Sequence, residues 1–155
     1  MSLRETIMEA LKDAMRARKE QETGTIRMII AKMRERDIEA RPSGNMDGIS
    51  DAEILSMMEG MVKQRRESIT MYEKGARADL VAQETAEIAI IETFMPKKLS
   101  SDATQVAITE AIAATGATSI KDMGKVMNLL KEKYAGQLDF AQVGASIKAR
   151  LSTAA

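Results

Sequence analysis

Apolar residues recur every three or four positions along nearly the whole chain, which is the spacing of one face of an α-helix. Ser2 and Glu5 have the pattern of a capping box and predict that a first helix begins there. Gly24 interrupts the pattern. A second helix is predicted after this glycine, because the next apolar side chains share one face: Ile26, Ile29, Ile30 and Met33.

A loop separates these two helices from two more. Residues 41–48 are rich in Pro, Gly, Asn and Asp, which favour turns. Ser50 begins a second capping box, and we expect the helix that follows to end near Gly75. Asp79 is the predicted cap of a fourth helix, which Pro96 stops because proline clashes with the preceding turn and has no N–H to donate.

Beyond Pro96 the predicted elements are shorter and richer in alanine. Three helices are expected there, each opened by a capping residue and the first two closed by a glycine. The caps are Ser100, Ser119 and Asp139, and the glycines are Gly116 and Gly136.

These patterns predict an all-α protein of two domains. Residues 1–96 are expected to form long helices packed as antiparallel hairpins, and residues 97–155 a small three-helix domain. The first part carries 15 basic and 18 acidic side chains, and the second carries 8 and 5. The formal net charge of zero therefore combines an acidic domain with a mildly basic one.

The composition argues against several classes of function. The chain has no histidine and no cysteine, so it lacks the usual general base, the thiolate nucleophile and the commonest metal ligands. A neutral chain is not typical of non-specific polyanion binders. No apolar run is long enough to span a membrane, and the N-terminus does not have the apolar segment of a secretory signal. We expect a cytoplasmic protein that has no catalytic residues, uses no cofactor or metal and binds no membrane.

Two charged residues lie within otherwise apolar helix faces. Arg65 falls among the apolar positions of the third predicted helix, and Glu84 among those of the fourth. If these helices run antiparallel, the two side chains meet at similar depth. The pair is either an internal ion pair that fixes the hairpin or a catalytic or anion-binding pair; the first reading is favoured because the pair offers neither a nucleophile nor a tuned base.

One predicted helix face has the character of a binding surface. Between Ser119 and Tyr134, the apolar side chains gather on one side of the helix and polar ones on the other. We call the polar set the lysine face: Lys121, Gly124, Lys125, Asn128 and Lys131. Glycine in a helix lets another backbone approach closely, and lysines around bare backbone can contact phosphates. Alternatively, the lysines are merely solvated and the glycine packs against a neighbouring helix.

Several blocks of the sequence resemble the GatB/YqeY family, and in particular its YqeY-like proteins. The resemblance covers essentially the whole chain and rests on four blocks and a pair of glutamates in a fixed order: Lys63–Ile69, Tyr72–Leu80, Glu84 with Glu87, Phe94–Ser100 and Lys121–Met127. It implies an all-α protein with an N-terminal helical domain and a small C-terminal one. It also implies similarity to the tail of the B subunit of glutamine-dependent tRNA amidotransferase, which helps to hold tRNA.

The resemblance makes a non-catalytic tRNA-associated module our first hypothesis. The matching residues are Lys121, Gly124 and Lys125, with Lys97 and Lys98 after the proline; many relatives have glycine where this chain has Asn128, which weakens close backbone approach there. The family is labelled a carbon–nitrogen ligase with glutamine as amido-N donor, but no residue here supports independent ligase activity. The alternatives are a protein-interaction adaptor that uses its methionine-rich helices and an accessory component of such a ligase. Expected partners are tRNA and an amidotransferase or synthetase component.

Overall fold

The computed structural model describes residues 1–153, and within them every regular element is helical. This agrees with the predicted all-α class. Along these described residues, seven α-helices and two short 3₁₀-helices follow one another: α1 (Leu3–Arg16), α2 (Glu20–Ala40), η1 (Arg41–Ser43), α3 (Asp51–Lys74), α4 (Ala78–Glu92), α5 (Ser101–Thr115), η2 (Ile120–Asp122), α6 (Met123–Lys133) and α7 (Phe140–Thr153).

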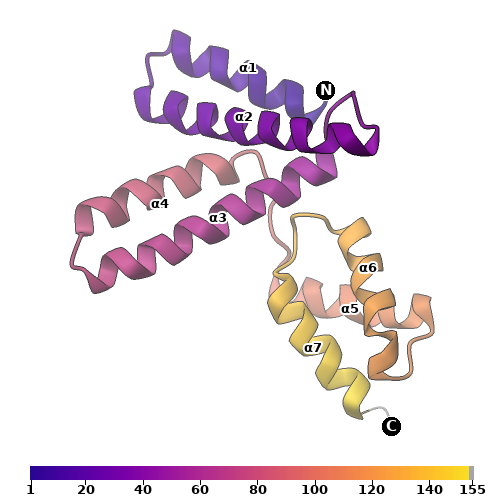
Figure 1. Cartoon of the computed structure of the whole chain (residues 1–155). Coiled ribbons are helices and arrows are strands. Elements are labelled where there is room, and N and C mark those ends of the chain that lie inside the picture. Colours follow the sequence, from indigo (N-terminus) through magenta and orange to yellow (C-terminus); the bar gives the residue numbers. More distant parts are fainter. Residues whose placement is uncertain (154–155) are drawn as a thin grey trace. The chain divides into compact units, whose positions relative to one another are not determined.

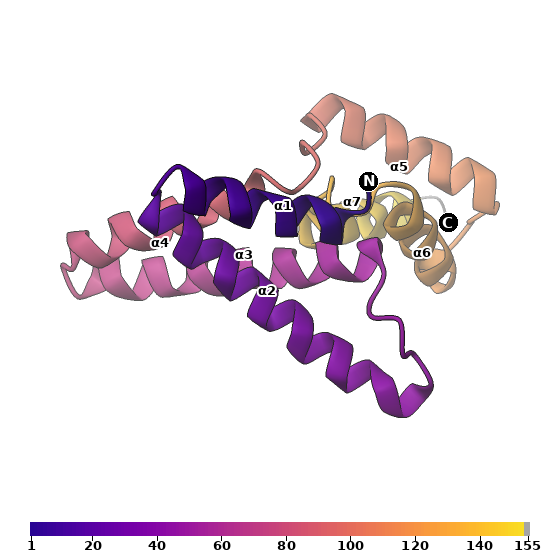
Figure 2. The ribbon, with the colours of Figure 1, turned by 90° about the horizontal axis from the view of Figure 1, so that it is seen from above.

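The chain divides into two compact units, which we call the N-terminal unit (Met1–Pro96) and the C-terminal unit (Lys97–Ala155). Each has its own hydrophobic core. In the N-terminal unit, α1 pairs with α2 and α3 pairs with α4 (Figure 1), and α2 also packs against α4. Figure 2 shows α2 crossing α3 rather than running along it. The fully buried side chains between these helices include Ile7, Ile26, Ile29, Met33, Ile54, Met58 and Ile91.

Two of the predicted helix boundaries in the N-terminal unit are wrong: the break at Gly24 and the cap at Asp79. Gly24 lies inside α2, which begins four residues earlier. The break falls at Arg18, which has a φ of 56° and donates its N–H to Met15, while Lys19 donates to Ala14. This is a Schellman motif, in which the left-handed position is usually glycine.

The turn between α3 and α4 follows the same scheme. Gly75 is the last, half-helical residue, with a φ of −85°, and the left-handed residue is Ala76, with a φ of 55°. Asp79 does not cap α4, because this helix already begins at Ala78; its carboxylate lies 3.0 Å from Arg77. α3 therefore ends beside Gly75 as predicted, and an alanine fills the left-handed position that follows.

The two capping boxes of this unit are confirmed. The Ser2 hydroxyl accepts from the N–H of Glu5, whose carboxylate accepts in turn from the N–H of Ser2, and Ser50 and Glu53 make the same exchange at α3. These reciprocal bonds satisfy N–H groups that the first turn of a helix otherwise leaves unpaired.

A half-buried ion pair that the sequence did not suggest holds the start of α1, the end of α2 and the following loop together. Both Nη atoms of Arg4 lie 2.8 Å from the carboxylate oxygens of Asp37. Asp37 also accepts from the N–H of Ile49, at 2.9 Å. Gly48 fits beside this pair because it has no side chain; a Cβ there would lie 2.7 Å from Arg4 Nη2.

In the C-terminal unit, α5, α6 and α7 pack against one another. Ser100 caps α5 as predicted, and Gly116 ends it in the left-handed conformation with a φ of 66°. The Asp139 carboxylate accepts from the N–H of Ala141 at the start of α7. The buried side chains of this unit include Ala107, Ile108, Ala111, Val126, Leu130, Leu138, Val143, Ile147 and Leu151.

Candidate nucleic-acid interface

The helix that carries the lysine face begins later than predicted. Ser119 is followed by the short helix η2, and α6 starts only at Met123. The Asp122 carboxylate accepts hydrogen bonds from the N–H groups of Thr118 and Ser119, at 3.0 and 3.3 Å. These bonds, with a smaller contribution from the positive charge of Lys125, hold the pKa of Asp122 below its usual value. A carboxylate that is charged at neutral pH therefore fixes the turn into α6.

The inward side of α6 explains why the lysine face points to solvent. Val126 and Leu130 are buried in the core of the C-terminal unit, with Met123 and Met127 packed against it. Residues on the opposite side of an amphipathic helix are exposed. All five members of the lysine face are exposed: Lys121, Gly124, Lys125, Asn128 and Lys131.

Gly124 is not required by packing within the described part of the C-terminal unit. A Cβ built on it meets no heavy atom within 4 Å beyond its own helix and its chain neighbours. The alternative in which this glycine packs against a neighbouring helix is therefore wrong for the described helices of the C-terminal unit. What remains is bare helix backbone in the first turn of α6, where the positive end of the helix dipole lies.

Lys97 and Lys98 are exposed and lie at the other end of α6. The following residue, Leu99, donates its N–H to the carbonyl oxygen of Gln137, 2.9 Å away, in the segment after α6. The two lysines therefore stand near the end of α6, away from Lys121, which lies in η2 just before α6 begins. The ammonium group of Lys131 lies 6.0 Å from the centre of the Phe140 ring, a cation–π contact with the start of α7.

The lysine face adjoins a carboxylate that the sequence analysis overlooked. Glu132 is exposed and follows Asn128 by four positions and Lys125 by seven, so it lies on the same side of α6. It forms no salt bridge within residues 97–153. This carboxylate could have been found from the sequence, because a helical wheel of α6 places Glu132 on the same side as Lys125 and Asn128.

Arg150, by contrast, belongs to the internal structure of the C-terminal unit. Its guanidinium group donates to the Thr109 hydroxyl at 2.6 Å and to the side-chain oxygen of Gln105 at 2.5 Å, so it ties α7 to α5.

The half-buried charges of the N-terminal unit do come together, with a different main partner from the one predicted. Arg65 Nε lies 3.0 Å from Glu87 and 3.9 Å from Glu84. Its Nη1 donates to the carbonyl oxygen of Met61 at 3.3 Å. Arg65 thus joins α3 to two carboxylates of α4, and Glu87 rather than Glu84 accepts its short hydrogen bond.

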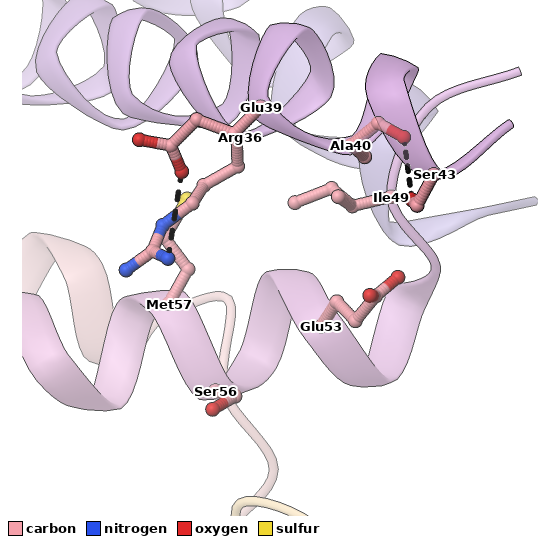
Figure 3. A pocket seen from close by; sticks show the side chains of 8 residues that line it. All are labelled: Arg36, Glu39, Ala40, Ser43, Ile49, Glu53, Ser56 and Met57. Atoms are coloured by element: carbon pink, nitrogen blue, oxygen red, sulfur yellow. Dashed lines mark hydrogen bonds and ion pairs between the residues drawn. The ribbon is translucent and has the colours of Figure 1, made fainter. Parts of the chain in front are cut away.

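A pocket of about 370 Å³ lies between the end of α2 and the start of α3 (Figure 3). Its charged groups are already engaged by the protein, because Arg36 lies 3.7 Å from Glu39 and Glu53 belongs to the capping box of α3. Its lining residues are Arg36, Glu39, Ala40, Ser43, Ile49, Glu53, Ser56 and Met57. Within residues 1–153, no three acidic side chains gather closely enough to hold a metal ion.

None of the described helices combines the length and the apolar character needed to cross a membrane. The location in the cytoplasm stays a prediction.

Comparison with known proteins gives two curated relatives. An uncharacterized protein of Schizosaccharomyces pombe is 23% identical over 100 residues, which are 64% of this chain and 77% of that protein. Altered inheritance of mitochondria protein 41 of Eremothecium gossypii, a mitochondrial protein by its name, is 34% identical over 89 residues, which are 57% of this chain. The match spans only 46% of that longer relative.

The family comparison covers far more of the chain. The model of the family described as Yqey-like protein matches residues 4–151, which cover most of each unit and the whole lysine face. The chain therefore belongs to the YqeY-like protein family.

Proposed function

We propose that the C-terminal unit binds the phosphate backbone of tRNA through the lysine face, and that the chain performs no catalysis of its own. The observation that carries this proposal is Gly124, an exposed glycine between Lys121 and Lys125 whose missing side chain serves no packing purpose within the described part of the C-terminal unit. A bare backbone flanked by cations suits the close approach of a sugar–phosphate chain.

The lysine face is suited to recognise the shape of a nucleic acid rather than its base sequence. Phosphate contacts fix the position of a protein on a nucleic acid and carry no sequence information directly. Structured RNA is recognised mostly through its shape and its backbone. Lys121 and Lys125 are a helical turn apart and supply two such contacts, and the other exposed lysines of the C-terminal unit add to the local positive potential.

The test is the salt dependence of tRNA binding by the purified chain. Binding should weaken steeply as salt is raised. The double variant Lys121→Glu/Lys125→Glu should lower the affinity at low salt by more than about tenfold and reduce the salt slope by about two, one for each lost phosphate contact.

A matched control separates a local site from the overall charge. Lys63→Glu/Lys74→Glu makes the same change in net charge on exposed positions of α3 in the N-terminal unit. It should leave binding nearly unchanged. Absence of salt-sensitive tRNA binding at low ionic strength, or equal losses in the two double variants, would contradict the proposal.

A second candidate is a protein-interaction adaptor, which is favoured by exposed methionines on the N-terminal unit. Met15, Met46 and Met71 are 50%, 74% and 66% exposed. Flexible thioether side chains adapt to varied partner surfaces. Recovery of the chain from cell extract with and without ribonuclease distinguishes the candidates, because an amidotransferase or synthetase component held by the adaptor surface should survive the nuclease.

A further inference from the structure

The unpaired carboxylate beside the lysine face needs a physical reason. Glu132 is exposed, and within residues 97–153 no cation forms a salt bridge with it. The ammonium groups of its two chain neighbours, Lys131 and Lys133, lie 6.0 and 5.6 Å from the rings of Phe140 and Tyr134. A carboxylate in this place repels the phosphates of any nucleic acid that the lysines attract.

The order of chemical groups from η2 along α6 suggests what offsets this repulsion. Cations lie at the start of the face, at Lys121 and Lys125, the amide of Asn128 follows, and Glu132 comes one turn later. The amide can donate and accept hydrogen bonds, whereas the ionised carboxylate only accepts. A ligand that fits this row presents phosphates and, beside them, hydroxyl groups.

RNA in A-form has this combination. Its wide, shallow minor groove displays ribose 2′-hydroxyls between the two phosphate strands, and each hydroxyl can donate a hydrogen bond. DNA has phosphates at similar places and no hydroxyl donor, so Glu132 would meet it with repulsion alone.

We propose that Asn128 and Glu132 contact ribose 2′-hydroxyls of an A-form RNA stem while Lys121 and Lys125 contact its phosphates, so that this surface selects RNA over DNA. The inference rests on the proposed function, since it assumes that the lysine face binds nucleic acid. It adds a class of ligand, a base-paired RNA stem, and two specificity-determining residues.

The experiment uses the full chain and three probes of one hairpin sequence: RNA, DNA and fully 2′-O-methylated RNA. The methylated probe keeps the A-form but cannot donate from the 2′-oxygen. At one low salt concentration, RNA should bind about tenfold more tightly than either of the others, as expected for the loss of one or two hydrogen bonds to polar or charged groups.

The variant Glu132→Gln gives a clearer test than the three probes alone, because it is expected to raise an affinity rather than lower one. Removal of the negative charge should raise the affinity for DNA several-fold and so reduce the preference for RNA. Asn128→Ala should lower the affinity for RNA and leave that for DNA unchanged. Glu110→Gln, which removes an exposed carboxylate from α5, is the matched control and should leave the RNA-to-DNA ratio as it is.

Failure of this inference differs from failure of the proposed function. Salt-sensitive RNA binding that is equally strong for the methylated or DNA probe would overturn the inference and leave the proposed function in place. So would an RNA-to-DNA ratio that Glu132→Gln does not change. Absence of salt-sensitive RNA binding would overturn both.

Discussion

The two units use their charged side chains in different ways. In the N-terminal unit, arginines join one helix to another, as Arg4 does with Asp37 and Arg65 with Glu87. In the C-terminal unit, Lys121 and Lys125 have no salt-bridge partner within residues 97–153 and lie on an exposed face. Charges that neutralise each other inside a unit fix the positions of its helices, whereas open charges are available to a partner.

This difference explains why the neutral total says little about function. Residues 1–96 have more acidic than basic side chains, and residues 97–155 have more basic than acidic ones. The sum is zero, but attraction of an anion depends on the charges that remain uncompensated at one surface. The comparison predicts that loss of charge destabilises the first unit and weakens binding by the second.

The largest loss of stability is expected for Asp37→Asn. This change removes the charge that pairs with both Nη atoms of Arg4, and hydrogen bonds to charged groups contribute roughly 2 kcal/mol. The free energy of unfolding should fall by about that amount. It is measured by denaturant titration in a Tyr134→Phe background, where Tyr72 fluorescence reports on the N-terminal unit.

Asp13→Asn is the matched control. Its partner Arg16 is one turn away on the same helix, and the Asp13 side chain is 67% exposed, so the loss should be below about 0.5 kcal/mol. Equal losses in the two variants would mean that an ion pair between two helices stabilises the unit no more than an exposed ion pair within one helix.

The same pair should give the N-terminal unit a pH-dependent stability. Hydrogen bonds from Arg4, more than any other cause, hold the pKa of Asp37 below its usual value. A depressed pKa in the folded state stabilises the fold above the unfolded-state pKa of about 3.9, and this stabilisation is lost as the pH falls through the lower, folded value. The difference in unfolding free energy between wild type and Asp37→Asn should therefore be constant near neutral pH and shrink below about pH 4. A difference that grows on acidification would contradict this assignment.

A smaller effect is expected at Arg65, where the two carboxylates can be ranked. Glu87→Gln removes the charged acceptor at 3.0 Å and should cost about 1 kcal/mol, and Glu84→Gln, whose carboxylate lies at 3.9 Å, should cost less than half of that. Double-mutant cycles with Arg65→Met, followed by Tyr72 fluorescence, give each coupling energy. A larger coupling energy for Glu84 than for Glu87 would mean that Glu84 is the main partner of Arg65, as predicted from the sequence.

These cases show which features a sequence can reveal. The capping boxes at Ser2 and Ser50 depend on residues three positions apart, and the apolar faces depend on helical periodicity, so both are local and were predicted. The exposed lysine face followed from the same periodicity. The short bond between Arg65 and Glu87 depends on the register of two helices, which no local pattern determines.

The break between the first two helices was misplaced for a different reason. Arg18 occupies a left-handed position that glycine usually fills, so a search for glycine points to Gly24 instead. At this position the hydrogen bonds of the Schellman motif offset the steric strain of a left-handed residue that carries a side chain. The role of Arg150 in joining α7 to α5 was not predicted from the sequence, because its hydrogen bonds depend on how the two helices pack.

Ala76→Gly should stabilise the N-terminal unit, by about 0.5 to 1 kcal/mol. Glycine removes the strain of a left-handed alanine, and the greater freedom of glycine in the unfolded chain offsets part of the gain. The midpoint of denaturation, again followed by Tyr72, measures the change. A decrease in stability would mean that the alanine methyl group contributes packing that outweighs the strain.

The variant Gly124→Ala bears most directly on the contrast between the units. Alanine has room there and is the better helix former, so the C-terminal unit should gain up to about 1 kcal/mol, less if the first turn of α6 is frayed. Gly60→Ala in α3 is the control, since that glycine is also exposed, helical and open. Both variants should be more stable than wild type, but only Gly124→Ala should weaken tRNA binding, because only there does a methyl group obstruct the approach of a phosphate backbone. A more stable Gly124→Ala variant with unchanged affinity would mean that the lysines alone make the surface, and that Gly124 serves neither the fold nor the partner.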